Sequence, residues 1–161
     1  MQVGIIVPYL APAQLSFLAV GQCNRAVRNG HEPIIFFENI SPMNVPTDFS
    51  MMNISEIWSF EGVIVATTLS SANLLRKAPN PSFKIFYVWD LEWLRGQMDF
   101  EKNVEIYRDE NIKLVARSRS HAEAIEKYCN RKVDFVTSNL DVERMMEKFE
   151  CNSQKQTVKF L

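Results

Sequence analysis

A group of charged and aromatic side chains follows an apolar run in the middle of the chain. The run comprises residues 84–89, and the side chains that end or follow it are Trp89, Asp90, Glu92, Trp93 and Arg95. Its length and its β-branched and aromatic content predict a strand buried on both faces of a parallel sheet. Open α/β sheets bind ligands beyond the carboxyl ends of their strands, so this group is the first candidate for chemistry.

Asp90 is the strongest single candidate for a catalytic role. Trp89 and Trp93 flank it in the sequence and would partly desolvate its carboxylate, which suits general-base catalysis. The sequence leaves an alternative open, in which Asp90 caps the following turn and the two tryptophans are core or interface anchors.

Two further polar residues follow the next apolar run. Arg117 and Ser118 come after residues 113–116 and could hold an anionic or hydroxyl-rich ligand, although a solvated surface arginine explains the pattern equally well. The two histidines, His31 and His121, have no Cys, Asp or second His at ligand spacing. We therefore expect both to be structural or exposed, and neither to be a metal ligand or a catalytic base.

The elements that must position these residues alternate between strands and helices. Strands are predicted at residues 3–7, 32–37, 63–67, 84–89, 113–116 and 133–136. Helices are predicted between Pro12 and Asn29, at 53–60, through Ala72 and Lys77, at 99–108, from Ser120 to Asn130, and after an Asp141 cap. The pattern predicts an α/β fold, a Rossmann-like three-layer sandwich with a mainly parallel sheet. Residues 38–52 are predicted to be irregular, as a binding loop or a surface excursion.

Composition narrows the class of protein. The chain has 161 residues, of which 47% are hydrophobic and 23% charged, as expected for one globular domain. A net charge of −1 indicates no general attraction to nucleic acid or to anionic membranes. Three widely spaced cysteines without a C-x-x-C pair, and no apolar stretch of membrane-spanning length, predict a reduced protein located in the cytoplasm.

Known nucleotide and metal motifs are missing from the sequence. The five glycines assemble neither G-x-G-x-x-G nor a phosphate-binding P-loop. We therefore expect no dinucleotide cofactor and no metal ion.

Five segments, in their order along the chain, resemble the amino-terminal, acceptor-side domain of GT-B glycosyltransferases of the family 4-like type. They are Asn29-Gly30-His31-Glu32, Phe60-Glu61-Gly62-Val63-Ile64-Val65, Val88-Trp89-Asp90-Leu91-Glu92-Trp93-Leu94-Arg95, Ala116-Arg117-Ser118-Arg119-Ser120 and Val136-Thr137-Ser138-Asn139-Leu140-Asp141-Val142-Glu143-Arg144. The resemblance covers residues 1–149 and implies one of the two Rossmann-like domains that face each other across a cleft in these nucleotide-sugar-dependent enzymes.

The chain departs from the family pattern at several points. Ala11-Pro12-Ala13 replaces the glycine-rich first loop, Trp89 replaces a histidine, and Leu140 replaces the glycine of the closing segment. The paired glutamates and basic residues of the donor domain are absent. Residues 1–150 are expected to form the Rossmann-like domain, and residues 151–161 a tail whose end, 156–161, resembles the first strand of the missing second domain.

The resemblance implies an acceptor-side half of a glycosyltransferase. Sugar transfer would then need a second polypeptide that carries the donor domain, or self-association of this chain, with the tail strand adding to the partner's sheet. Asp90 is the candidate catalytic residue. The candidate acceptor-binding residues are Tyr9, Gln14, Thr67, Thr68, Arg95, Arg117 and Ser118.

Two alternatives from other classes remain open. One is a non-catalytic Rossmann-like binding or assembly module that uses an exposed Trp89 and Trp93 region as a protein interface. The other is a small-molecule enzyme of flavodoxin-like plan with a cofactor at the same strand ends.

Overall fold

Strands and helices alternate along most of the chain, as the sequence predicts, with three strands in succession between residues 32 and 53 as the main exception. The computed structural model describes residues 1–95 and 99–157. Its strands are β1 (Gln2–Ile6), β2 (Tyr9–Leu10), β3 (Glu32–Phe37), β4 (Asn39–Ile40), β5 (Ser50–Asn53), β6 (Val63–Ala66), β7 (Phe83–Val88), β8 (Lys113–Ala116) and β9 (Phe135–Val136). Its α-helices are α1 (Gln14–Arg28), α2 (Leu69–Lys77), α3 (Phe100–Glu105), α4 (Arg119–Cys129) and α5 (Val142–Thr157), and its 3-10 helices are η1 (Ile54–Ser59), η2 (Glu92–Leu94) and η3 (Ile106–Arg108).

Seven strands form one sheet, in the order β5-β3-β1-β6-β7-β8-β9, and every pair in it is parallel. Numbered along the chain within this sheet, the order is 3-2-1-4-5-6-7, which is the doubly wound Rossmann order with one strand added. The order reverses between β1 and β6, so the two neighbouring loops leave the sheet toward opposite faces. The predicted fold class is confirmed.

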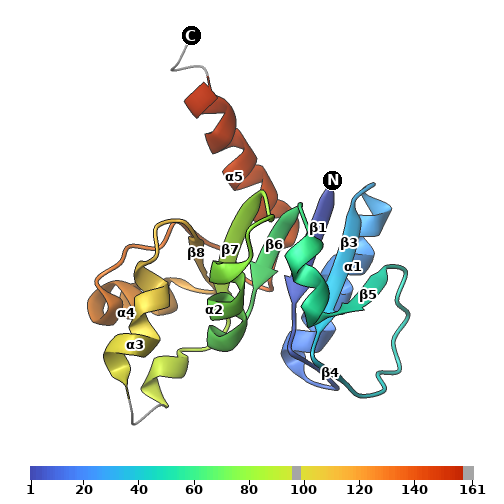
Figure 1. Cartoon of the computed structure of the whole chain (residues 1–161), viewed down its shortest axis with the longest axis horizontal. Coiled ribbons are helices and arrows are strands. Elements are labelled where there is room, and N and C mark those ends of the chain that lie inside the picture. Colours follow the sequence, from blue (N-terminus) through green and yellow to red (C-terminus); the bar gives the residue numbers. More distant parts are fainter. Residues whose placement is uncertain (96–98, 158–161) are drawn as a thin grey trace.

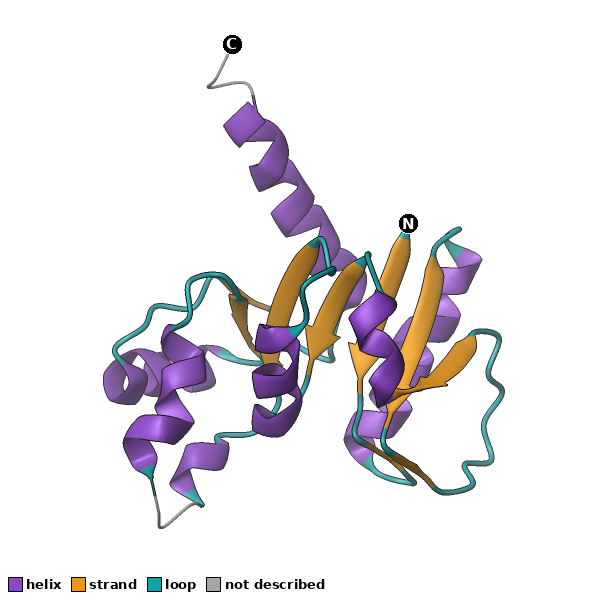
Figure 2. Cartoon of the chain, in the orientation of Figure 1, coloured by secondary structure: helices purple, strands orange, loops and turns teal. Residues whose placement is uncertain are grey.

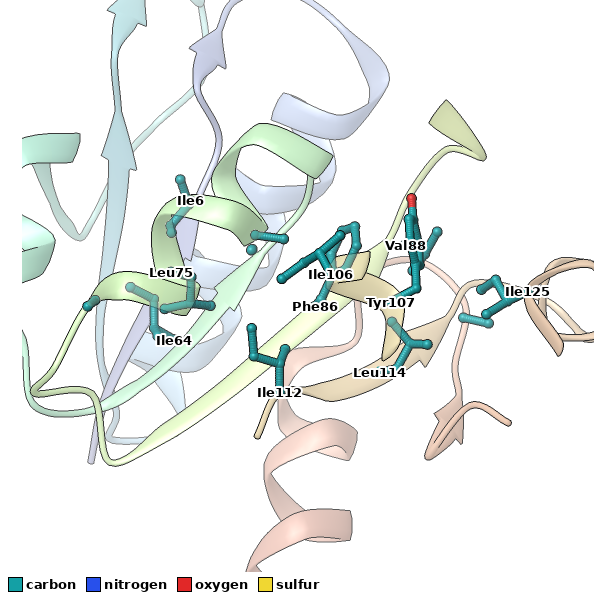
Figure 3. Close-up of a cluster of buried hydrophobic side chains, with 14 of the residues drawn as sticks. Ile6, Ile64, Leu75, Phe86, Val88, Ile106, Tyr107, Ile112, Leu114 and Ile125 are labelled. Atoms are coloured by element: carbon teal, nitrogen blue, oxygen red, sulfur yellow. The ribbon is translucent and has the colours of Figure 1, made fainter. Parts of the chain in front are cut away.

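Helices cover both faces of the sheet and complete three layers (Figure 1). One face packs against α1 and α5, through residues such as Val20, Cys23 and Met145. The other face packs against η1, α2, η2, α3, η3 and α4, and Figure 3 shows the core of this side. The predicted packing of α5 through Val142, Met145, Met146 and Phe149 is confirmed by the burial of all four side chains.

The central strand β7 shows why a strand that is covered on both faces has a continuous apolar sequence. Ile85 and Tyr87 point into the α1 side of the core, whereas Phe86 and Val88 point into the opposite side. All four are fully buried. Side chains alternate between the faces of a strand, so a strand covered on both faces needs apolar residues at every position.

Residues 38–52 hold more structure than predicted. β4 pairs in parallel with β2 to make a separate two-stranded sheet, which Figure 2 shows beyond the arrowheads of β1 and β3. β5 pairs with β3 at the edge of the main sheet. The prediction of an irregular segment is therefore wrong at both strands. A two-residue strand carries no periodicity, and all four residues of β5 are exposed, so no alternating pattern marks either strand.

Two helix ends also differ from the prediction. α4 begins after Ser118, whose hydroxyl accepts a hydrogen bond from the His121 amide at 3.2 Å, and not after Ser120. At the end of the chain, α5 continues through Thr157, so Gln156 and Thr157 are helical and not the start of a strand. The remainder of the predicted tail strand, residues 158–161, lies outside the described residues.

Candidate functional site

A cleft of about 340 Å³ lies at the carboxyl ends of β7, β8 and β9. Its walls come from the first turns of α1 and α4 and from the turn between β9 and α5. The lining residues are Gln14, Tyr87, Trp89, Arg117, Ser118, Ser120, His121, Ser138 and Asn139. Hydroxyl, amide, indole and imidazole groups thus converge here, together with one guanidinium. This chemistry suits a neutral, hydroxyl-rich ligand better than an apolar or a highly charged one.

The cleft brings together three of the residues that the sequence singles out for binding. Gln14 is the first residue of α1 and Ser118 caps α4, while Arg117 follows β8 directly. Parallel strands put their carboxyl ends at one edge of the sheet, so residues far apart in the sequence meet there.

Arg117 is held in place by Trp89. Its guanidinium lies 4.4 Å from the centroid of the Trp89 ring, and its Nη1 donates a hydrogen bond to the Trp89 carbonyl at 3.1 Å. A cation over an indole face is the strongest form of this contact. The alternative of a freely solvated arginine is therefore wrong, and the pair forms a fixed wall of the cleft.

His121 also lines the cleft, which the sequence interpretation did not anticipate. It lies in the first turn of α4, and its Nδ1 is buried without a hydrogen-bond partner in the described chain. Burial, followed by the nearby charge of Arg117, lowers the pKa of His121, while the Val88 backbone and Asp90 act in the opposite direction. Burial and Arg117 therefore favour the neutral form of the imidazole. The sequence contains a signal for this position, because His121 is three residues after the helix cap Ser118, which is two residues after the end of β8.

The floor of the cleft is a buried hydrogen-bonded turn. The Tyr87 hydroxyl donates to the Thr137 carbonyl at 3.0 Å and accepts from the Leu140 amide at 3.2 Å. Burial raises the pKa of Tyr87. Asn139 and Leu140 have φ values of 58° and 54°, in the left-handed region that favours glycine. Leu140 therefore adopts glycine-like backbone geometry, and its fully buried side chain contributes to the core.

Asp90 and Arg95 lie outside the residues that line the cleft. They form an ion pair at 2.7 Å between Arg95 Nη2 and Asp90 Oδ2, with side chains 76% and 39% exposed respectively. The expected desolvation of Asp90 is therefore slight. The capping alternative is not seen either, because η2 begins after Leu91 without a side-chain cap.

The neighbouring carboxylate, Glu92, has a structural role. Its Oε1 accepts a hydrogen bond from the Leu69 amide at 2.8 Å, at the start of α2. An anion at a helix amino terminus is stabilised by the helix dipole. Burial raises the pKa of Glu92, and this hydrogen bond opposes that effect.

Three other predicted binding residues are not in the cleft. Thr67 is 1% exposed, and its hydroxyl donates to the Ile6 carbonyl at 2.6 Å, so it joins β6 to β1 and cannot reach a ligand. Thr68 caps α2, because its hydroxyl accepts a hydrogen bond from the Ser71 amide at 3.1 Å. Tyr9 lies on β2 and is 68% exposed.

Trp93 is not part of an exposed surface. It is 3% exposed and packs edge-on against Tyr107 with ring centroids 4.9 Å apart. The prediction of an exposed interface made by Trp89 and Trp93 together is therefore wrong.

Within residues 1–95 and 99–157, no group of three or more His, Cys, Asp or Glu side chains is placed to hold a metal ion. No helix in this part of the chain has the length and apolarity needed to span a bilayer.

No protein-family model, no curated protein and no solved structure matches the chain.

Proposed function

We propose that this chain is the acceptor-side domain of a GT-B-type glycosyltransferase and that the cleft at β7–β9 binds a saccharide acceptor. The observation that carries the proposal is the lining of the cleft, in which hydroxyl and amide side chains surround one indole ring. Pyranose rings combine polar edges with an apolar face, so a ring such as that of Trp89 can pack against the apolar face while the polar groups bind hydroxyls.

The backbone around the cleft supports this proposal. α1 starts at Gln14 without a side-chain cap in the described structure and without an acidic residue in its first turn, so amide donors there are available to ligand oxygens. The positive φ of Leu140 supports the resemblance as well, because the family has a glycine in this segment.

We propose His121, rather than Asp90, as the group that accepts a proton from the acceptor hydroxyl; its Nδ1, without a partner among the described residues, is buried, so the ring must turn to reach the ligand. Its imidazole lines the cleft, whereas the Asp90 carboxylate is paired with Arg95. In the transfer, the acceptor oxygen loses its proton to the base and bonds to the anomeric carbon. The bond from that carbon to the nucleoside diphosphate breaks, and the diphosphate leaves with the electron pair. Burial, and after it the charge of Arg117, lowers the pKa of the imidazole and so favours its unprotonated form before this step.

The donor sugar would come from elsewhere. A second polypeptide with a nucleotide-sugar-binding domain, or a second copy of this chain, would close over the cleft. We therefore expect the chain alone to bind acceptors and to bind nucleotide sugars weakly or not at all.

Calorimetric titration of the full chain with a panel of mono- and disaccharides tests the proposal. A saccharide should bind at one site, and Gln14→Ala should weaken binding by about tenfold, as the loss of a hydrogen bond to a buried ligand predicts. Gln2→Ala is the matched control, because Gln2 is exposed at the amino end of β1, away from the carboxyl ends of the strands that form the cleft. Failure of every saccharide to bind, or equal losses in both variants, would refute the proposal.

A further inference from the structure

A second cavity lies on the α1 side of the sheet, between α1, the β2–β4 sheet, β5 and the loop that joins β4 to β5. Its volume is about 350 Å³, near the lower end of the range for ligand pockets. Six apolar side chains form most of its wall: Leu10, Val20, Ile40, Met43, Val45 and Met51. No charged residue lines it.

The cavity has a buried floor and an accessible mouth. Leu10 and Val20 are 2% and 4% exposed, whereas Ile40 and Met51 are 52% and 39% exposed. An apolar cavity offers water few hydrogen-bond partners, so an apolar group that enters it displaces little bound water. Two methionines in the wall can adapt to the shape of a guest.

The outer wall of the cavity is fixed to the body of the protein. Asn24 of α1 donates from Nδ2 to the Pro46 carbonyl at 2.9 Å and accepts at Oδ1 from the Asp48 amide at 3.0 Å. These two hydrogen bonds hold the β4–β5 loop over α1. The site is therefore formed before any ligand binds, which lowers the entropic cost of binding.

Charge around the cavity selects against anionic ligands. No lysine or arginine occurs between Arg28 and Arg76, a stretch that contains five carboxylates. Two of them, Glu38 and Asp48, flank the residues that form the mouth, and both are exposed. Recognition of anionic lipid headgroups needs lysine or arginine near the surface, and the stretch that forms the mouth of the cavity has none.

We propose that this cavity binds the alkyl chain of an amphiphile whose headgroup is uncharged or cationic. The inference is independent of the saccharide cleft, which has a different lining and different elements around it, so either site can be present without the other.

Adjacent methionines on β5 provide a matched pair of variants. Met51 faces the cavity and is 39% exposed, whereas Met52 is 40% exposed and does not line it. Their sheet neighbours confirm the opposite orientation, because Met51 is opposite Ile35 of the α1-side core and Met52 is opposite Phe36 of the other core.

The experiment is calorimetry of the full chain with three decyl amphiphiles below their micelle concentrations: a tetraethylene glycol ether, a trimethylammonium and a sulfate. The ether contains no sugar, so it does not probe the cleft. We expect saturable one-site binding of the ether and the ammonium, and at least about tenfold weaker binding of the sulfate. Met51→Asp should weaken ether binding by about tenfold or more, and Met52→Asp by less than about twofold.

Three results would overturn the inference: no saturable binding of the ether, equal losses in the two aspartate variants, or binding of the sulfate as tight as that of the ether. Val45→Trp provides a second variant in case Met51→Asp is poorly folded. It keeps the wall apolar and fills the cavity, so it should weaken ether binding while the circular dichroism spectrum stays that of the wild type.

Discussion

At the scale of single residues, His121 gives the site its most distinctive chemistry. His121 is costly to protonate, because it is partly buried beside an arginine. One of its ring nitrogens lacks a partner in the described chain. The same arrangement leaves a neutral base next to the indole and hydroxyl groups of the cleft. Arg117 therefore makes two interactions in the cleft: it stacks on Trp89, and its charge adds to burial in lowering the pKa of His121.

Titration of the His121 ring proton signal by NMR tests this arrangement. We expect a midpoint below the ordinary histidine value of about 6.5, because burial and Arg117 lower the pKa. Arg117→Gln removes one of these causes, so it should raise the midpoint. An unchanged midpoint in that variant would show that Arg117 does not act on His121.

The lowered pKa also sets the direction of a pH effect on stability. The unfolded chain binds a proton at this histidine near pH 6.5, and the folded chain does so only at lower pH. The contribution of His121 to the free energy of unfolding is thus complete above about pH 6.5. It is lost as the pH falls toward the pKa of His121 in the folded chain. Urea unfolding between about pH 7 and pH 5 should lose less free energy in His121→Gln than in the wild type.

At the scale of elements, the cap of α4 both starts the helix and lines the cleft. The hydroxyl of Ser118 accepts the amide of His121, while Ser120 makes no cap hydrogen bond. We predict that Ser118→Ala lowers the free energy of unfolding by about 1 kcal/mol. Ser120→Ala, on the exposed side of the same turn, should change it by less than about 0.5 kcal/mol. Chemical denaturation of both variants measures the difference, and the reverse order would restore Ser120 as the cap.

The approach of β6 to β1 depends on a glycine. A Cβ added at Gly62 would overlap the backbone oxygen of Gln2 and would lie 2.8 Å from Phe60 Cζ. Backbone atoms cannot move aside without breaking the strand pairing, so Gly62→Ala should destabilise the fold by more than about 2 kcal/mol. Gly21→Ala is the control, because Gly21 lies in α1 with open space around it, and this change should stabilise the helix by about 0.5–1 kcal/mol. Thermal unfolding of the two variants should move in opposite directions.

The elements show which parts of the fold a sequence can predict. The long apolar runs, such as β7 and β8, were predicted within one or two residues because burial on both faces demands apolar residues at each position. β2, β4 and β5 were missed, because the first two are two residues long and β5 is fully exposed. Their pairing arises from the tertiary arrangement of β1 and β3, which short-range patterns do not contain.

The candidate site was predictable only in its location. Of the acceptor-binding candidates that the resemblance implies, Gln14, Arg117 and Ser118 line the cleft at the carboxyl ends of the strands. Thr67 belongs to the same set of candidates, but its hydroxyl donates to the Ile6 carbonyl. Distances between strands decide which polar side chains form hydrogen bonds within the protein and which are left to bind a ligand. The sequence does not give these distances.

At the scale of the whole molecule, α5 connects the cleft with the far end of the sheet. Its first residues follow the turn that forms the floor of the cleft, and Figure 1 shows the helix extending past the end of the sheet at which the amino terminus lies. An ion pair between Arg25 Nε and Glu143 Oε2 at 2.9 Å fixes its start against α1. A partner that bound α5 would therefore touch an element continuous with the proposed acceptor site.

The thiols report on the integrity of the two cores. Cys23 and Cys129 are free and buried, one on each side of the sheet. Burial raises the pKa of Cys23 to about 12 and that of Cys129 to about 11, so neither forms a thiolate near neutral pH. In a Cys151→Ser variant, we predict that an aromatic disulfide reagent labels the native protein very slowly and labels two thiols once urea unfolds it. Rapid labelling in the native state would contradict this packing.

We propose that the cleft at β7–β9 binds saccharide acceptors, and NMR mapping of backbone and indole amides on the full chain is the sharpest test of this proposal. A saccharide that binds should shift the Trp89 indole signal and the amides of Gln14, His121 and Asn139, with little change around the apolar cavity near Met51. Shifts that cluster elsewhere on the molecule, or none at millimolar saccharide, would contradict the assignment of this cleft as an acceptor site.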